Sequence, residues 1–304
     1  MKEHGFSRAA AGGTGRTLAP EGIRTPSNPE GPQRLKAALE KRPTARLKSC
    51  PSKSRSAMNN PDMLSSETIP HPRENDRTLV IMAKAPRPGT VKTRLAQTLP
   101  VEAVTELYCC LLDDTLALAH SLPGVKVAIM CPAADVNELA QLAGGATEVV
   151  AQRGEGLAAA LTSVFAHFAA NDGQRVVAFN SDSPHLPASV LGDAFETLNA
   201  HDVAVGPTYD GGYYLVGAKA AHGGLFDGDG MGTGSALDGL LARAKRLQLS
   251  VGFTDPFYDI DVEDDLTRLA AELQLAPARA PRTAAWLQQW RQVMPQLRAG
   301  SGDL

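Results

Sequence analysis

From Thr78 to about Leu275, short apolar segments of strand length alternate with longer segments that have a helical apolar period, and this limits the possible folds more than any other feature. The strand-like segments cover residues 78–84, 125–131, 147–152 and 175–180, and helical patterns over 101–122, 135–142 and 157–169 separate them. Apolar strands separated by helices predict a mostly parallel α/β sheet flanked by helices. In such folds, ligands bind beyond the carboxyl ends of the strands.

The pattern changes after a predicted helix over residues 188–198. Strand-like segments over 202–207 and 212–218 are joined by a short link containing Asp210 and Gly211, which predicts an antiparallel pair. A helix ending near Arg246, strands near 248–253 and 257–260, and helices from Glu263 and Arg282 are expected to follow. We therefore predict one α/β domain over 78–275 and a C-terminal helical extension over 276–304.

Residues 1–77 have no sustained apolar period and carry 14 Lys and Arg against 8 Asp and Glu, whereas the rest of the chain has 16 against 25. Such a segment buries too little apolar surface to offset its ordering entropy, so a disordered basic tail is predicted. Two alternatives are a tail that contacts nucleic acid or an acidic partner, and a mis-assigned start upstream of Met58 or Met63. The acidic remainder lacks the clustered cations of a nucleic-acid surface, so no nucleic-acid partner is expected.

The cysteines and the hydropathy pattern suggest the compartment. The four cysteines form no CxxC or Cys/His cluster, so neither a zinc site nor a disulfide framework is indicated. Cys109 and Cys110 are expected to be small buried apolar residues of a helix. No run of about 18 apolar residues and no secretion signal are present, so no membrane span is expected and the predicted location is the cytoplasm.

The loop after the first predicted strand, KAPRPGTVKTRL (84–95), concentrates cations next to a helix start. Backbone amides and positive side chains there favour an anion, and phosphate groups fit best. The loop is neither a Walker A motif nor GxGxxG, and the alternative is a solvated basic turn. The residues assigned to nucleotide or phosphate binding are Lys84, Pro86, Gly89, Lys92, Arg94 and, in a later loop, Gly154.

Two acidic positions are candidates for a metal site. Asp182 follows the strand over 175–180, and Asp261 belongs to the acidic run DIDVEDDL (259–266), in which Asp259 lies on the same face. Mg²⁺ prefers hard oxygen ligands and takes one or two protein carboxylates, with substrate phosphates completing its shell. Mg²⁺ or Mn²⁺ is therefore expected at Asp182 and Asp261. The alternative for each aspartate is a helix cap.

The segment GPTYDGGYYLVG (206–217) is the candidate acceptor side. Asp210 could hold an acceptor hydroxyl or act as a catalytic base, and Gly211, Gly212 and Tyr213 would lie beside the acceptor. An Asp-Gly turn is also common without function. His185 is expected in a loop and His167 on a helix surface.

These segments, together with NSDSPHLP (180–187) and GMGTGSAL, resemble the DUF2064 family, in order over about residues 78–275. The family is described as glycosyltransferases of the arsenosugar-biosynthesis type, or as transferases associated with radical SAM and selenium-domain proteins. The resemblance implies a GT-A nucleotide-diphospho-sugar transferase fold with Asp182 as the metal ligand, phosphate contacts from Lys84, Lys92 and Arg94, and Asp261 and Asp265 as paired acids. The sequence departs from the family at Val262, where Thr is common, and at Met231, where Trp is common.

The leading hypothesis is a metal-dependent glycosyltransferase that uses a nucleotide-diphosphate sugar and an unknown small-molecule acceptor, with Lys92 and Arg94 stabilising the charge of the leaving group. The first motif is also similar to those of the 2-phospholactate and molybdenum cofactor guanylyltransferase families, so nucleotidyl transfer with release of diphosphate is the alternative. A non-catalytic nucleotide-binding protein is the third possibility.

Overall fold

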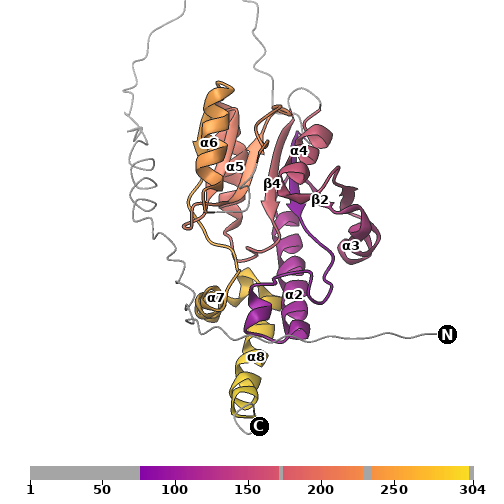
Figure 1. Cartoon of the computed structure of the whole chain (residues 1–304), viewed down its shortest axis with the longest axis vertical. Helices are drawn as coiled ribbons and strands as arrows, with labels where there is room; N and C mark the ends of the chain where they lie inside the picture. The colour runs from indigo at the N-terminus through magenta and orange to yellow at the C-terminus, as the bar shows by residue number, and fades with distance from the viewer. Residues whose placement is uncertain (1–75, 171–173, 229–233, 301–304) are drawn as a thin grey trace, which may run out of the picture. The chain divides into compact units, whose positions relative to one another are not determined.

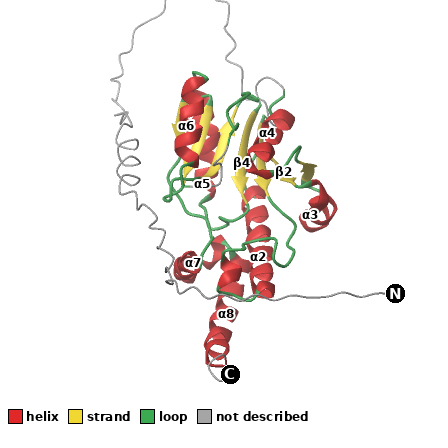
Figure 2. Cartoon of the chain, viewed as in Figure 1, coloured by secondary structure: helices red, strands yellow, loops and turns green. Residues whose placement is uncertain are grey.

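A single sheet of seven strands forms the centre of the part of the chain that the structure describes, with helices packed against it (Figure 1, Figure 2). The structure is a computed structural model, and it describes residues 76–170, 174–228 and 234–300. The strands are β1 (Arg77–Met82), β2 (Val125–Cys131), β3 (Glu148–Ala151), β4 (Arg175–Asn180), β5 (Val203–Pro207), β6 (Tyr213–Ala218) and β7 (Val251–Phe253). Their order across the sheet is β3-β2-β1-β4-β6-β5-β7.

The directions of the strands confirm the predicted fold class. β1 pairs in parallel with β2 and with β4, and β2 pairs in parallel with β3. β6 is antiparallel to β4 and to β5, which in turn is parallel to β7. The predicted antiparallel pair over 202–207 and 212–218 is therefore confirmed, and β6 is the one reversed strand among those described.

Helices connect most of the strands, as the alternating sequence pattern predicts. They are α2 (Val101–His120), α3 (Val136–Ala143), α4 (Gly156–Phe168), α5 (Ala188–Ala200), α6 (Ala236–Arg246), α7 (Glu263–Leu275) and α8 (Pro281–Gly300). Short 3-10 helices occur as η1 (Leu95–Gln97), η2 (Ala133–Asp135) and η3 (Pro277–Arg279). None of the helices in the described ranges is long and apolar enough to cross a lipid bilayer.

The strands are buried on both faces because their residues point alternately to two sets of helices. Leu79, Ile81 and Phe179 belong to one core with Leu116 of α2 and Phe195 of α5. The intervening residues face the other side of the sheet, where α4 contacts β1, β2 and β4. The parallel strands thus receive cover on both faces.

A second core lies beside the first and joins distant parts of the sequence. Leu107 of α2 packs there with Ile260, Leu269 of α7 and Leu287 of α8. Leu95 and Leu99, which follow the basic loop, belong to the same cluster. This core therefore supports both the loop at 84–94 and the acidic segment at 259–261.

Two predicted strands need correction. The segment 257–260 is not a strand, because Phe257 makes only an isolated bridge to Thr208 and the chain then leaves the sheet. The strand predicted near 248–253 is limited to β7, and residues 248–250 precede it. The predicted tail before Asp76 and Met231 of the glycine-rich loop lie outside the described residues.

Candidate active site

The carboxyl ends of the four parallel strands β1 to β4 meet at one edge of the sheet and open into a cleft. Met82 of β1 is in register with Met130 of β2 and with Asn180 of β4, and Cys131 of β2 is in register with Ala151 of β3. The residues that follow these strands line a cleft of about 940 Å³. This is the position at which α/β sheets bind ligands.

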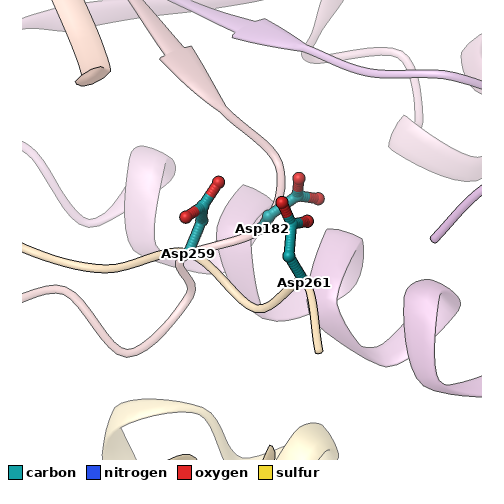
Figure 3. Close-up of side chains that lie close together, drawn as sticks. All are labelled: Asp182, Asp259 and Asp261. Carbon is teal, nitrogen blue, oxygen red and sulfur yellow. The ribbon is translucent and has the colours of Figure 1, made fainter. Parts of the chain in front are cut away.

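Three aspartates form the acidic wall of this edge (Figure 3). Asp182 lies two residues after β4, while Asp259 and Asp261 come from the segment between β7 and α7. One carboxylate oxygen of each lies within 4.8 Å of the other two. Asp182 and Asp261, the two predicted metal ligands, are therefore neighbours, and Asp259 joins them. Such a set of hard oxygen atoms suits Mg²⁺ or Mn²⁺.

Lys92 inserts its ammonium group between two of these carboxylates. Its Nζ lies 2.7 Å from Oδ2 of Asp182 and 3.0 Å from Oδ1 of Asp261. The Lys92 side chain is 4% exposed, whereas that of Arg94 is 64% exposed and reaches Oδ2 of Asp261 at 3.4 Å. Lys92 also has a positive φ of 48°, which is uncommon for a residue other than glycine.

The electrostatics of the cluster differ from one group to the next. Burial raises the pKa of Asp259 to about 6, and the negative charges of Asp261 and Asp182 act in the same direction against Lys92. Burial would lower the pKa of the Lys92 ammonium, but Asp182 and Asp261 outweigh burial and raise that pKa above its ordinary value. Lys92 is therefore a permanent cation within the site.

Neither of the two predicted metal ligands, Asp182 and Asp261, caps a helix. Oδ2 of Asp265 accepts hydrogen bonds from the backbone N–H groups of Asp261 and Val262, each at 2.9 Å, and so caps the start of α7. The carboxylate of Asp261 remains directed at Lys92 and Arg94. Helix α5 has Pro187 at its N-cap, five residues after Asp182.

Tyr108 connects the basic loop to the acidic wall. Its hydroxyl accepts a hydrogen bond from the backbone N–H of Lys84 at 3.2 Å and shares one with Oγ of Ser181 at 3.1 Å. The Ser181 hydroxyl also lies 3.2 Å from Oδ1 of Asp182. Burial raises the pKa of Tyr108 to about 12, with a further contribution from the negative charge of Asp182, so the phenol stays neutral at physiological pH.

The predicted phosphate-binding residues divide into two groups. Lys84, Lys92, Arg94 and Gly154 line the cleft, whereas Pro86 and Gly89 do not. Gly154 has a φ of +79° and lies in the turn before α4, whose first residue, Gly156, also borders the cleft. The N-terminus of α4 thus presents backbone N–H groups and a positive helix end to the cleft.

Arg87 fixes the shape of the basic loop. Its guanidinium pairs with Asp135 at 2.5 Å and with Glu138 of α3 at 2.9 Å. The other carboxylate oxygen of Asp135 accepts a hydrogen bond from the backbone N–H of Ala85 at 3.0 Å. Arg87 therefore anchors the loop to η2 and α3, and the cations that reach the cleft are Lys84, Lys92 and Arg94.

The predicted acceptor residues are not among those that line the described cleft. Asp210 is exposed, and its Oδ1 accepts hydrogen bonds from the Thr208 hydroxyl at 2.5 Å and from the backbone N–H of Gly212 at 3.2 Å. Gly211, with a φ of +90°, would place a Cβ atom 2.0 Å from the carbonyl oxygen of Gly234. This turn, followed by the half-buried Tyr213, therefore contacts the chain directly after the undescribed residues 229–233.

Sequence reasoning did not assign three residues that the structure brings to the site or directly beneath it. These residues are Asp259, Tyr108 and Ser181. Asp259 belongs to the predicted acidic run. For Tyr108 and Ser181 the sequence shows only that the first lies in a predicted helix and that the second precedes Asp182.

His185, expected in a loop, is buried at 0% exposure against Phe257 and Tyr258. Burial, with the positive charges of Arg268 and Arg279, lowers the pKa of His185 to about 3, so this side chain is neutral.

Several solved structures are similar to this chain. A structure from Desulfovibrio desulfuricans G20, provisionally assigned as a nucleotide-diphospho-sugar transferase, is 28% identical with a TM-score of 0.66, over 73% of this chain and 98% of that one. A nucleotidyl transferase from Methanothermobacter is 17% identical with a TM-score of 0.45, over 65% of this chain and 97% of that one. A 4-diphosphocytidyl-2C-methyl-D-erythritol synthase from Anaerococcus prevotii is 13% identical with a TM-score of 0.44, over 66% of this chain and 97% of that one. No curated protein matches the sequence.

The family comparison agrees with the motif pattern. The model of DUF2064, described as an uncharacterized protein conserved in bacteria, matches residues 115–233. This match includes Gly154, Asp182 and the turn at Asp210, while Lys92 and Asp261 lie outside it. The match agrees with the resemblance seen in the motifs over the part of the chain that it covers.

Proposed function

We propose that the protein is a metal-dependent glycosyltransferase whose donor is a nucleotide-diphosphate sugar bound in the cleft at the ends of β1 to β4. The observation that carries the proposal is the combination of a triad of carboxylates, of which Asp182 and Asp261 line the cleft, with three cations from a single loop that line the same cleft. The carboxylates suit a divalent ion, and the cations suit the phosphates that such an ion would bridge. The similarity to the Desulfovibrio protein supports the same class of substrate.

Each side of the cleft has a distinct part in this proposal. Asp182, Asp259 and Asp261 would hold Mg²⁺ or Mn²⁺, which when bound neutralises charge on the diphosphate leaving group. Lys84 and Arg94 are exposed at the cleft and would bind phosphate oxygens, together with the backbone amides at Gly154 and Gly156. The apolar lining from Met130, Pro132 and Leu157 leaves room for the base and ribose.

The acceptor side rests on the turn at Asp210. That turn borders the 234–237 segment, since the backbone N–H of Leu237 donates to the carbonyl oxygen of Gly211 at 3.0 Å. We assign the acceptor to this side, with Asp210 as the base or as the group that holds the acceptor hydroxyl. Its present hydrogen bonds to Thr208 and Gly212 would have to rearrange for either part.

Nucleotidyl transfer is the second candidate, and the density of cations favours it. Lys84, Lys92 and Arg94 all line the cleft, which would suit the greater charge of a nucleoside triphosphate. The two reactions differ in their products, because nucleotidyl transfer releases diphosphate and glycosyl transfer releases a nucleoside diphosphate.

A thermal-shift screen followed by product analysis tests the proposal. The purified protein is melted with nucleoside diphosphates, triphosphates and sugar nucleotides, each with Mn²⁺ or with a chelator. A ligand at a hundredfold excess over its Kd stabilises the folded state by about 3 kcal/mol, which raises the melting temperature by several degrees. We expect such a shift with one sugar nucleotide and Mn²⁺, and release of the nucleoside diphosphate when an acceptor is supplied.

Matched variants assign the effect to the triad. Asp182→Asn and Asp261→Asn should lose the metal-dependent part of the shift, whereas Asp264→Asn, an exposed aspartate of the same acidic run, should keep it. The ligand-induced difference is compared within each variant, because removing a partner of buried Lys92 also lowers the starting melting temperature. A shift with triphosphates alone, and release of diphosphate, would replace glycosyl by nucleotidyl transfer; binding without turnover would leave a non-catalytic protein.

A further inference from the structure

The position of Lys92 has a consequence for how metal and nucleotide enter the cleft. Its Nζ is within 3.0 Å of carboxylate oxygens from both Asp182 and Asp261. These are two of the three groups whose oxygens all lie within 4.8 Å of one another. The ammonium therefore occupies the same small region that a divalent ion bound by the triad would need.

The two cations exclude each other by charge and by space. A divalent ion within this ring of oxygens would lie only a few ångströms from the ammonium, a distance at which two positive charges repel. The Lys92 side chain is almost fully buried, so the repulsion would be poorly screened. Either the metal is kept out or the ammonium has to leave.

The loop that carries Lys92 borders the cleft, so the ammonium group can move into it. Thr90, Val91, Lys92, Thr93 and Arg94 all line the cleft, and Thr90, Thr93 and Arg94 are exposed. Lys92 itself has a left-handed backbone conformation, which is unfavourable for a residue other than glycine. A change of the Lys92 backbone to an ordinary conformation would relieve this strain, and the side chain would stay beside the cleft, which Lys92 already lines.

We propose that Lys92 is a tethered cation that holds the metal position in the ligand-free protein and exchanges with the divalent ion when a metal–diphosphate complex enters the cleft. This inference rests on the proposed function. Metal alone has to displace the ammonium without offering it a new partner, so metal alone binds weakly. The metal–diphosphate complex supplies both the ion for the carboxylates and an anion for Lys92, so metal and nucleotide enter together.

Direct binding of Mn²⁺ to the nucleotide-free protein, followed by electron paramagnetic resonance, tests the exchange without any measurement of activity. Lys92→Met keeps the length of the side chain and removes the charge, and it should bind Mn²⁺ at least about tenfold more tightly than the wild type, equivalent to about 1.4 kcal/mol. Lys84→Met is the matched control, since Lys84 lines the same cleft, whereas the ion pairs of the triad among the described residues come from Lys92 and Arg94. It should change the affinity by less than about threefold.

A second measurement uses the wild-type protein, because three facing carboxylates without Lys92 could prevent folding. The ¹⁵Nζ and ¹³Cε signals of Lys92 are followed by NMR as Mg²⁺ with inorganic diphosphate is added. We expect these signals to shift with saturation, and a much higher Mg²⁺ concentration to be needed when diphosphate is left out.

The outcomes separate this inference from the proposed function. Equal Mn²⁺ affinity of Lys92→Met and the wild type, or Lys92 signals that stay fixed while backbone signals of Asp182 and Asp261 saturate, would overturn the exchange and leave a metal-dependent transferase in place. Absence of Mn²⁺ binding in every variant would remove the metal from the proposed function and the exchange with it.

Discussion

Asp259 shows how far residue-level reasoning reaches at this site. Asp182 and Asp261 could be predicted as neighbours because acidic residues after strands meet at one sheet edge. Asp259 lies two residues before Asp261 and could be placed on the same face, but its part depends on burial, which the sequence does not contain. The same applies to Tyr108, whose hydroxyl contacts depend on where α2 passes under the loop.

The raised pKa of Asp259 predicts a pH-dependent loss of stability. A carboxyl group whose pKa is about 6 in the folded state and 3.8 ordinarily holds its proton more tightly when folded. The proton therefore stabilises the folded state below about pH 4, and this contribution is lost as the pH rises to about 6. In the presence of a chelator, Asp259→Asn should be more stable than the wild type at pH 7.5 by about 1 to 3 kcal/mol.

Urea unfolding at pH 4 and pH 7.5 measures this effect. The difference between Asp259→Asn and the wild type should be small at pH 4 and large at pH 7.5. Asp264→Asn serves as the control, because its exposed carboxylate is outside the triad. A wild-type protein that is as stable as the Asp259→Asn variant at pH 7.5 would contradict the assignment of a strained, buried carboxylate.

Tyr108 gives a second prediction at this scale. Tyr108→Phe keeps the buried ring but leaves the backbone N–H of Lys84 and the hydroxyl of Ser181 without this partner. The loss of such a buried hydrogen-bonding group costs about 1 to 3 kcal/mol. Because Ser181 also contacts Asp182, the affinity of the protein for Mn²⁺ should fall along with its melting temperature. A lower melting temperature with unchanged Mn²⁺ affinity would mean that Tyr108 has only a structural role.

Among the elements, α7 and the segment before it depart most from what the sequence predicts. Residues 257–260 have the composition of a strand, yet Tyr258 and Ile260 pack into the second core with α7 rather than onto the sheet. Ser183 holds this path by donating to the carbonyl oxygen of Tyr258 at 3.1 Å. A long-range contact of this kind overrides local strand propensity, and it directs Asp259 and Asp261 toward Asp182.

The start of α7 offers a stabilising substitution. Val262 is the N-cap residue, its backbone is extended and its side chain has no oxygen to accept a backbone hydrogen bond. Val262→Thr supplies that oxygen for the N–H of Asp265, and an added N-cap acceptor stabilises by about 1 kcal/mol. The melting temperature should rise by about 2 to 4 °C, measured by calorimetry. Val262→Ala, which adds no acceptor, should show no increase, and an equal rise in both variants would rule out capping as the cause.

For the whole molecule, the alternation of strands and helices was enough to predict the α/β class and most element positions. It did not predict that β6 inserts between β4 and β5, because strand order depends on contacts between distant segments. It also did not predict the second core.

Residues 276–304 were expected as a helical extension. In the structure, Asp114 of α2 accepts hydrogen bonds from the backbone N–H groups of Arg282 and Thr283 at the start of α8.

The contacts of Asp76, the first described residue, give the last prediction. The predicted domain begins at residue 78, but both carboxylate oxygens of Asp76 accept hydrogen bonds from the guanidinium of Arg175, at 2.8 and 2.7 Å. The backbone carbonyl of Asp76 also accepts from the N–H of Arg175 at 2.7 Å. The Arg175 side chain is 7% exposed, so a chain that starts at Thr78 would leave a buried cation with Asn199 as its one side-chain partner among the described residues.

Removing one partner of a buried ion pair destabilises by about 3 to 5 kcal/mol. A chain of residues 78–304 should therefore melt several degrees below one of residues 76–304. The full chain with Asp76→Ala should lose a similar amount, because it removes the carboxylate and keeps the backbone. If the 78–304 chain is destabilised and the Asp76→Ala variant is not, the hydrogen bond from the Arg175 backbone N–H to the Asp76 carbonyl oxygen provides the stability, and the ion pair does not. If all three match the wild type, the ion pair with Arg175 contributes nothing, and residue 78 is an adequate start for the folded region.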